Sequence, residues 1–391
     1  MIKCASVFTY EIDDPDIALE EIKAQLDEKI ALEEHTVAVV MCNPEFVTSG
    51  VIKLISESLP FPLVGATSSA QAVNGEAGEL ILTMFVITSD DVRFVIGATG
   101  DLLGDVDGPT EAAYRKCSAG EDSPPRLALI FPPLLLEYAG DAYVNAWSKV
   151  IPGTPLFGSV ATEEAPPFVQ CETICDGKTF RSAMTFILCY GNINPRFLVG
   201  SLNESTTVPF KGEITKSHGS FVEEINGINA YRYFEERGIA KDGRMDTKFG
   251  YVLYSIDQKK REDYDGVPVV RGLASFTEDG TAIFRGEMDE GSTFRMLTSD
   301  SADVLKTTHE LTLKLGELGD INGVLMFSCI IRRMMTMGSG SIKELELVKN
   351  TISPDIPFMM GYAGGEVCPT SIKDGIPTNR FHNFSLVVLA I

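Results

Sequence analysis

The sequence predicts an α/β protein with three quasi-repeated β-α-β-α-β-β units and a mostly antiparallel β insertion before the third unit. A short phrase supports this prediction: a proline, two or three apolar residues, a glycine and small residues. The phrase occurs three times, centred on Gly65, Gly158 and Gly361. Each copy follows a continuous apolar run and a helix-length segment, and another strand-like run comes after it. Such self-similarity indicates that one supersecondary unit is repeated.

The first unit shows the pattern most clearly. Lys3–Thr9 is strand-like, and the helical segment Asp14–Leu26 begins with acidic residues, which favour a helix N-terminus. Val37–Cys42 is a continuous apolar run, the pattern of a strand that is buried on both faces of a parallel sheet. The next helix ends at Leu59-Pro60 because proline disfavours a helical residue before it.

The other units follow the same order, with central apolar runs at Leu127–Phe131 and Val324–Cys329. For the third unit we assign Thr293–Leu297 as the first strand and Ala302–Leu315 as the first helix. Gly158 and Gly361 lie about 110 residues further apart than Gly65 and Gly158, so extra chain must precede the third unit. We therefore divide the chain into residues 1–195, with two units, and residues 196–391, with the insertion at about 196–290 and then the third unit.

The insertion is expected to be mostly antiparallel. Short strand-like runs alternate there with turn dipeptides such as Asn226-Gly227 and Asp279-Gly280. One short helix, Ala230–Arg237, is followed by Gly238, a residue that commonly ends a helix in a left-handed conformation.

Composition excludes several classes of partner. The formal net charge of −22 opposes binding to nucleic acid and to anionic membranes. No run reaches the roughly twenty apolar residues that a membrane span needs, and the first residues lack a signal-peptide layout. The eight cysteines have no regular disulfide spacing and no convincing metal-ligand spacing, which favours reduced thiols in the cytoplasm.

The third unit carries the candidate ligand site. Cys329 and Arg332 follow a strand at its carboxyl end, where α/β folds place ligands, and an arginine can pair bidentately with a carboxylate. Glu366 follows two glycines and would accept an amine, which together with Arg332 suits a zwitterionic amino acid. A surface cation and a solvated turn carboxylate remain the alternatives. We expect a pocket where the third unit meets the insertion, formed by Cys329, Arg332, Gly361, Tyr362, Glu366 and Asn383.

The sequence gives little support for catalysis. It has no Gly-x-Ser-x-Gly elbow, no phosphate-binding Walker loop and no His-Glu-x-x-His motif, so no catalytic or metal-binding residue is assigned. The enzyme alternative is a thiol-dependent reaction centred on Cys329. A nearby cation and a helix start would lower the pKa of that thiol.

Several phrases resemble the FIST family, with its N-terminal and C-terminal domains in tandem over nearly the whole chain. They are Leu-Val-Gly-Ala-Thr-Ser-Ser-Ala and Pro-Leu-Phe-Gly-Ser-Val-Ala-Thr in the first part, and Phe-Ser-Cys-Ile-Ile-Arg-Arg and Ile-Pro-Phe-Met-Met-Gly-Tyr-Ala-Gly-Gly-Glu in the second. The resemblance implies a small-molecule sensor in signal transduction, with an amino acid or related metabolite as ligand. Heme is the alternative, because some relatives implicated in nitric-oxide sensing bind it. The segment Ala66–Gln71 departs from the family pattern, since it lacks the usual acidic residue.

The resemblance also bears on partners. FIST-like parts use all 391 residues, which leaves no output domain in this sequence. The expected partner is then a separate signalling protein, such as a histidine kinase or a cyclase, or a second copy in a homo-oligomer.

Overall fold

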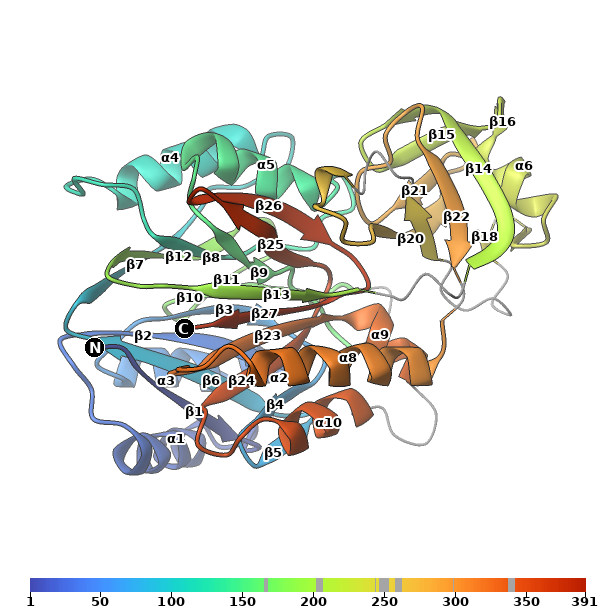
Figure 1. The fold of residues 1–391 in the computed structure, drawn as a ribbon. Coiled ribbons are helices and arrows are strands. Elements are labelled where there is room, and N and C mark those ends of the chain that lie inside the picture. Colours follow the sequence, from blue (N-terminus) through green and yellow to red (C-terminus); the bar gives the residue numbers. More distant parts are fainter. Residues whose placement is uncertain are drawn as a thin grey trace.

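The computed structural model has an α/β body and a separate β-rich lobe (Figure 1). The residues that it describes are 1–164, 168–201, 207–242, 244–245, 253–256, 262–297, 299–336 and 342–391. The α/β class is confirmed, because parallel and antiparallel strands share each sheet of the body and helices lie between the strands in sequence. No helix in the described part of the chain has the length and apolar character needed to cross a membrane.

The first unit forms one sheet and its covering helices. Its strands are β1 (Lys3–Thr9), β2 (His35–Cys42), β3 (Leu63–Thr67) and β6 (Leu82–Ser89). Its helices are α1 (Pro15–Lys29), α2 (Glu45–Thr48) and α3 (Val51–Ser58). The strand order is β1-β6-β2-β3, in which β2 and β3 are parallel and the other neighbours are antiparallel.

The second and third units repeat this order. The second has β7 (Val92–Ala98), α4 (Asp107–Cys117), β8 (Leu127–Phe131), α5 (Asp141–Val150), β9 (Leu156–Ser159) and β12 (Thr185–Gly191). The third has β13 (Arg196–Gly200), α8 (Ser301–Gly316), β23 (Val324–Cys329), α9 (Ile330–Thr336), α10 (Lys343–Thr351), β24 (Phe358–Ala363) and β27 (Leu386–Ala390). Their sheets run β7-β12-β8-β9 and β13-β27-β23-β24, so each unit orders its strands as first, last, second and third.

Each unit also has a hairpin that pairs with the sheet of another unit. The hairpins are β4–β5 (Gln71–Val73 and Glu76–Gly78), β10–β11 (Thr173–Cys175 and Lys178–Phe180) and β25–β26 (Glu366–Lys373 and Ile376–His382). They extend β24 of the third unit, β3 of the first and β9 of the second, respectively. These three pairings form a cycle among the units. Two of them join a strand before residue 195 to a strand after it, so the sheet of each unit is complete only when the other units are folded as well.

The position of the insertion corrects our assignment of the third unit. The predicted first strand, Thr293–Leu297, is wrong: it is β22, and it pairs within the sheet of the lobe. Arg196–Gly200 takes that place beside β27. The insertion thus lies between β13 and α8, inside the third unit rather than before it. The composition of a strand does not specify the sheet to which it belongs. Because β22 immediately precedes α8 in the sequence, we assigned it to the same unit as that helix.

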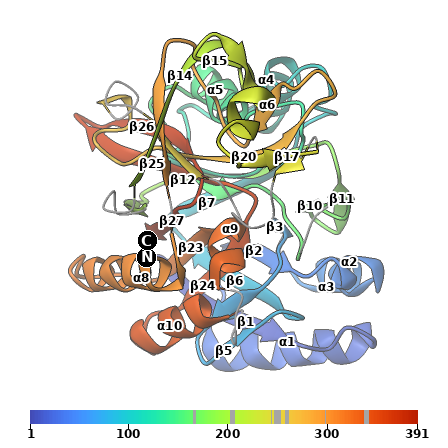
Figure 2. The ribbon, with the colours of Figure 1, turned by 90° about the vertical axis from the view of Figure 1, so that its right-hand side faces the viewer.

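The described part of the lobe includes a seven-stranded antiparallel sheet, a two-stranded ribbon and the helix α6. Its elements are β14 (Thr207–His218), β15 (Phe221–Ile225), β16 (Ile228–Asn229), α6 (Ala230–Glu235), β17 (Ala240–Lys241), β18 (Arg244–Met245), β19 (Leu253–Ile256), β20 (Val270–Phe276), β21 (Ala282–Phe284) and β22. Figure 2 shows it in the upper half of the view, in front of α4 and α5 and away from α1, α3 and α10.

The body has one inner core and three outer ones. Phe131 and Phe157 of the second unit's sheet meet Phe327 of the third unit's sheet at the centre, with ring centroids 6.1 Å apart for Phe131–Phe327 and 5.2 Å apart for Phe157–Phe327. Along β2, Val39 belongs to this inner core while Val40 packs under α1 and α3. The continuous apolar runs in the sequence therefore reflect strands that are buried on both faces.

Gly65 and Gly158 occupy equivalent places, each opposite a residue of the parallel neighbouring strand. A Cβ on Gly65 would lie 1.8 Å from the carbonyl oxygen of Val40, and a Cβ on Gly158 would lie 1.7 Å from that of Ile130. A Cβ on Gly361, in β24, would instead meet the flexible end of Met41 at 3.0 Å.

We therefore expect Gly65→Ala and Gly158→Ala each to lower the free energy of unfolding by about 3 kcal/mol or more, because backbone must move to admit the methyl group. Gly361→Ala should cost clearly less, since a methionine side chain can adjust. Chemical denaturation of the three variants measures the difference. Equal losses at all three positions would contradict this explanation.

Candidate functional site

A cavity of about 470 Å³ lies where the second unit, the third unit and the lobe meet. This size is in the range of small-molecule sites. It is lined by Leu134, Leu136, Thr162, Phe168, Val169, Leu273, Ala274, Ser275, Arg285, Ile330, Ile331, Met334, Gly364 and Asn383. The junction of the third unit and the insertion is thus hollow, at the place where we expected a pocket.

Apolar side chains dominate the walls. Ile330, Ile331 and Met334 come from α9, and Leu273 comes from β20 of the lobe. Leu136 and Val169, from the second unit, are 58% and 61% exposed, so apolar surface continues outward. A ligand with an apolar body would remove this surface from water, at roughly 25 cal/mol for each Å² covered.

Arg285, directly after β21, is the charged residue among the described lining residues. Its guanidinium makes no hydrogen bond or ion pair with any residue that the structure describes. Burial lowers the pKa of this guanidinium, but an arginine side chain still keeps its charge in a protein. A partly buried cation without a partner is costly, so this position favours an anion in the cavity.

Asn383 is the second polar group, and it stands just before β27. Its side chain is 2% exposed, and Nδ2 donates to the carbonyl oxygen of His382 at 3.2 Å. Oδ1 has no hydrogen-bond partner among the described residues. Asn383 is therefore a predicted site residue that lines the cavity and holds a buried acceptor without a described partner.

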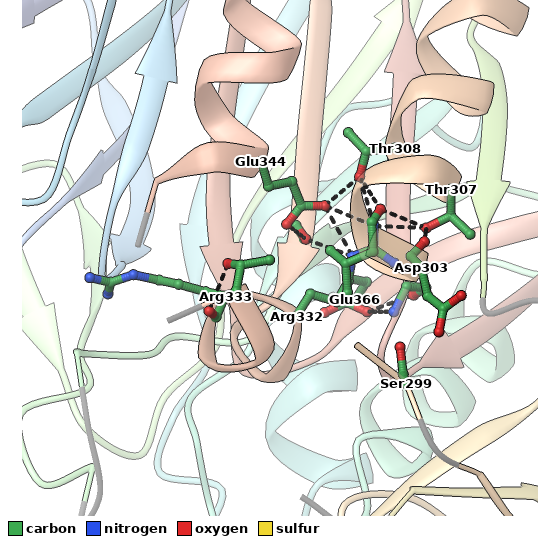
Figure 3. A network of polar contacts seen from close by, with 12 residues as sticks. Ser299, Asp303, Thr307, Thr308, Arg332, Arg333, Glu344 and Glu366 are labelled. Carbon is green, nitrogen blue, oxygen red and sulfur yellow. Dashed lines mark hydrogen bonds and ion pairs between the residues drawn. The ribbon is translucent and has the colours of Figure 1, made fainter. Parts of the chain in front are cut away.

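The structure places Arg332 differently from our expectation. Its side chain is fully buried, and Nη2 forms an ion pair with Oε1 of Glu344 at 2.8 Å. Nη2 also donates to Thr308 Oγ1 at 2.8 Å, while Nε donates to Ser328 Oγ at 3.2 Å. Figure 3 shows this network between α8, α9 and α10. Arg332 thus has a carboxylate partner inside the protein and does not line the cavity.

Local sequence explains why these groups converge. Asp300 caps α8 by accepting from the backbone N–H groups of Ala302 and Asp303, and this fixes the helix start. Thr308 then faces α10, where it donates to Glu344 Oε1 at 2.7 Å. Ser328 donates to the other oxygen of the same carboxylate at 3.0 Å. Arg332, Glu344, Thr308 and Ser328 therefore bond to one another in an otherwise apolar core, where Nη1 of Arg332 alone among their described polar atoms has no partner.

Glu366 and Cys329 lie near Arg332 but are also fully enclosed. Ser385 Oγ donates to Glu366 Oε2 at 2.6 Å, and burial raises the pKa of Glu366 well above its usual value. Burial, together with the Glu366 charge, likewise raises the pKa of the Cys329 thiol. The enzyme alternative predicted a lowered pKa for the Cys329 thiol. That prediction is wrong, because desolvation outweighs the effect of the neighbouring arginine.

Gly361 and Tyr362 are fully buried in β24. Ser68 donates to the carbonyl oxygen of Tyr362 at 2.9 Å, and the guanidinium of Arg333 lies 5.9 Å from the Tyr362 ring centroid. Of the six predicted residues, Cys329, Arg332 and Glu366 are electrostatic neighbours inside the third unit, and Asn383 lines the cavity. No local sequence pattern distinguishes Arg285 from an ordinary charged residue after an antiparallel strand.

A buried contact fixes the lobe beside the cavity. Arg271, on β20, forms an ion pair with Asp141 at the start of α5, at 3.0 Å. The Tyr264 hydroxyl accepts from Arg271 at 2.8 Å and donates to the carbonyl oxygen of Phe381 at 3.0 Å. The other Asp141 oxygen accepts from the backbone N–H of Glu287 at 2.9 Å. These bonds hold β20 and β21, and hence Arg285, against the body.

Comparisons with known proteins give the following matches. The family model of the FIST N domain matches residues 36–228, and that of the FIST C domain matches residues 235–369. No curated protein sequence matches the chain. Among solved structures, cyanuric acid hydrolase from A. caulinodans is 8% identical with a TM-score of 0.38, over 100% of this chain and 99% of that one.

The buried Arg332–Glu344 ion pair should contribute to the stability of the protein. Arg332→Met should lower the free energy of unfolding by about 3–5 kcal/mol, because it leaves the Glu344 carboxylate buried without its cation. Replacing both residues, as Arg332→Met with Glu344→Leu, should cost less than Arg332→Met alone. Guanidinium-chloride unfolding of the single and double variants tests this, and simple additivity of the two losses would refute the coupling.

The burial of His382 makes the stability of the protein depend on pH. Its ring is buried, Nε2 donates to the carbonyl oxygen of Cys368 at 3.0 Å, and burial lowers its pKa to about 4. The unfolded chain would take up the proton first as pH falls, so stability is complete above about pH 6.5 and is lost toward pH 4.

We expect the wild type to lose roughly 3 kcal/mol more than His382→Gln between pH 7 and pH 4, since only the wild type must keep this ring neutral. Unfolding curves at a series of pH values measure the two slopes. Parallel slopes would show that His382 does not control the acid side.

Proposed function

Because the chain belongs to the FIST family, whose domains are small-ligand sensory domains in signal transduction, we propose that it senses a small carboxylate metabolite, such as an amino acid or a relative of one, in the cavity between the lobe and the body. The observation that carries this proposal is Arg285. It is a cation without a described partner, and it lines a cavity with mostly apolar walls.

The chemistry of the walls supports a carboxylate over a neutral ligand. A hydrogen bond to a charged group contributes about 1.5–3 kcal/mol, and more than one can form when a carboxylate meets the planar guanidinium. The apolar residues would add affinity through burial, and Asn383 would fix orientation. The ligand would thus supply the charge partner that the protein does not give Arg285.

A change in the lobe would carry the signal. Leu273, Ala274, Ser275 and Arg285 belong to the lobe, whereas the remaining walls belong to the body, so a bound ligand would contact both. We infer that a separate signalling protein, such as a histidine kinase or a cyclase, or a second copy of the chain, reads this change. All eight cysteines are free, which favours a cytoplasmic setting.

The site gives no support to a heme-based sensor or to a thiol-dependent enzyme. The described residues that line the cavity include no histidine or cysteine that would ligate heme iron. The Cys329 thiol is buried with a raised pKa, unlike an activated nucleophile.

The proposal predicts that small carboxylates stabilise the protein through Arg285. In a thermal-shift screen of amino acids and apolar carboxylic acids, a ligand at a hundred times its Kd should add about 2.7 kcal/mol to the free energy of unfolding. Arg285→Ala should remove this stabilisation while the protein without ligand stays folded, because Arg285 has no described partner to lose.

Arg181→Ala is the matched control. Arg181 is 70% exposed, pairs with Glu172 and lies outside the cavity lining, so its loss should leave the ligand effect unchanged. A carboxylate that stabilises Arg285→Ala as strongly as the wild type would place the ligand elsewhere. Equal loss in both arginine variants would indicate a general charge effect.

A further inference from the structure

We propose that the cavity selects a monoanion over a zwitterion: its ligand carries one carboxylate, one uncharged hydrogen-bond donor and an apolar body, as an N-acylated amino acid does. This inference rests on the proposed function, because it concerns the same cavity. It differs from our sequence-based expectation of a zwitterionic amino acid, in which Glu366 would accept the ammonium group.

The charge of the lining is the first argument. Among the described residues that form the walls, Arg285 is the only charged one, and none is an aspartate or a glutamate. A carboxylate would therefore find a partner, whereas the ammonium group of a free amino acid would lose water without gaining an opposite charge. Such unpaired burial of an ammonium group is strongly unfavourable.

Glu366 does not change this balance. Its side chain is fully buried and is not among the lining residues, and Ser385 donates to one of its oxygens, whereas the other, Oε1, is buried without a described partner. Burial also raises the pKa of the Glu366 carboxyl, which reduces the negative charge that it could offer. An ammonium group in the cavity would thus have no exposed carboxylate to approach.

Asn383 is the second argument, and it is independent of charge. One N–H of Nδ2 donates to the His382 carbonyl oxygen, whereas Oδ1, an acceptor, has no hydrogen-bond partner among the described residues. Asn383 lines the cavity and is 2% exposed, and an unsatisfied buried acceptor costs about 1–3 kcal/mol, so a ligand donor that reaches Oδ1 would be favoured. An amide N–H or a hydroxyl group supplies that donor without adding charge.

The remaining walls describe the rest of the ligand. Thr162 and Ser275 offer hydroxyl groups, but the other side chains are apolar, with Phe168 and Met334 among the largest. A volume of about 470 Å³ accommodates an aromatic or branched side chain together with a small acyl group. The three requirements converge on a modified amino acid or a hydroxy acid of similar size.

Four probes that share one phenyl group separate these requirements. N-acetylphenylalanine has the carboxylate and the N–H donor, phenylalanine is the zwitterion, 3-phenylpropionate lacks the donor, and phenylalaninamide is a cation. By isothermal titration calorimetry, N-acetylphenylalanine should bind the full-length protein at least about 10-fold more tightly than phenylalanine. It should bind about 3- to 10-fold more tightly than 3-phenylpropionate, and phenylalaninamide should bind weakest.

Two substitutions at one position test the role of Asn383. In Asn383→Ala, the difference between N-acetylphenylalanine and 3-phenylpropionate should disappear. In Asn383→Asp, a carboxylate of nearly the same shape lines the cavity. The affinity for phenylalanine, relative to the affinity for N-acetylphenylalanine, should therefore rise by about 10-fold or more. Thermal melts verify that each variant is folded. If the alanine variant fails to fold, the aspartate variant alone decides.

The outcomes separate this inference from the proposed function. If phenylalanine binds as tightly as N-acetylphenylalanine and both depend on Arg285, the selection for a monoanion is wrong and the carboxylate sensor stands. If N-acetylphenylalanine does not bind the wild type, or if Asn383→Asp leaves the preference unchanged, the inference is overturned. The proposed function itself fails only when no carboxylate of the wider screen depends on Arg285.

Discussion

The exchange of hairpins among the three units is the constraint on which the rest of the structure depends. Each four-stranded sheet leaves its third strand with an open edge, and another unit's hairpin covers that edge with antiparallel bonds. Unpaired edges expose backbone donors and acceptors, so closing them in a cycle ties the stability of each unit to the other two. The cycle also carries Glu366 and His382, the ends of the exchanged hairpin, into the place where the third unit meets the second.

The lobe turns this closed body into a candidate receptor. Its chain leaves after β13 and returns at α8, and the described contacts that join it to the body include the buried pair of Arg271 and Asp141. That contact is stabilising only while both charges stay paired, because loss of either would leave the other desolvated. The cavity walls come from both sides of this junction. Ligand binding and the contact that holds the lobe therefore involve different side chains of the same junction.

Sequence reasoning succeeded where one local pattern determined one element, and it failed where a tertiary partner decided. Continuous apolar runs identified the buried strands around Val39, and the glycine phrases marked equivalent third strands. The sequence could not assign Thr293–Leu297 to a sheet, since period and composition do not specify a neighbour. It also could not find Arg285, whose importance comes from cavity walls that are distant in sequence.

Arg332 and Arg285 show why residue type and position alone did not identify the site. Both are arginines near a strand end, and both are largely removed from water. The protein supplies Arg332 with Glu344, Thr308 and Ser328, which satisfies its charge and makes it part of the core. It supplies Arg285 with no described partner and places it on a cavity. The difference between a structural cation and a receptor cation thus lies in whether the fold already contains the counter-charge, and that is a property of packing.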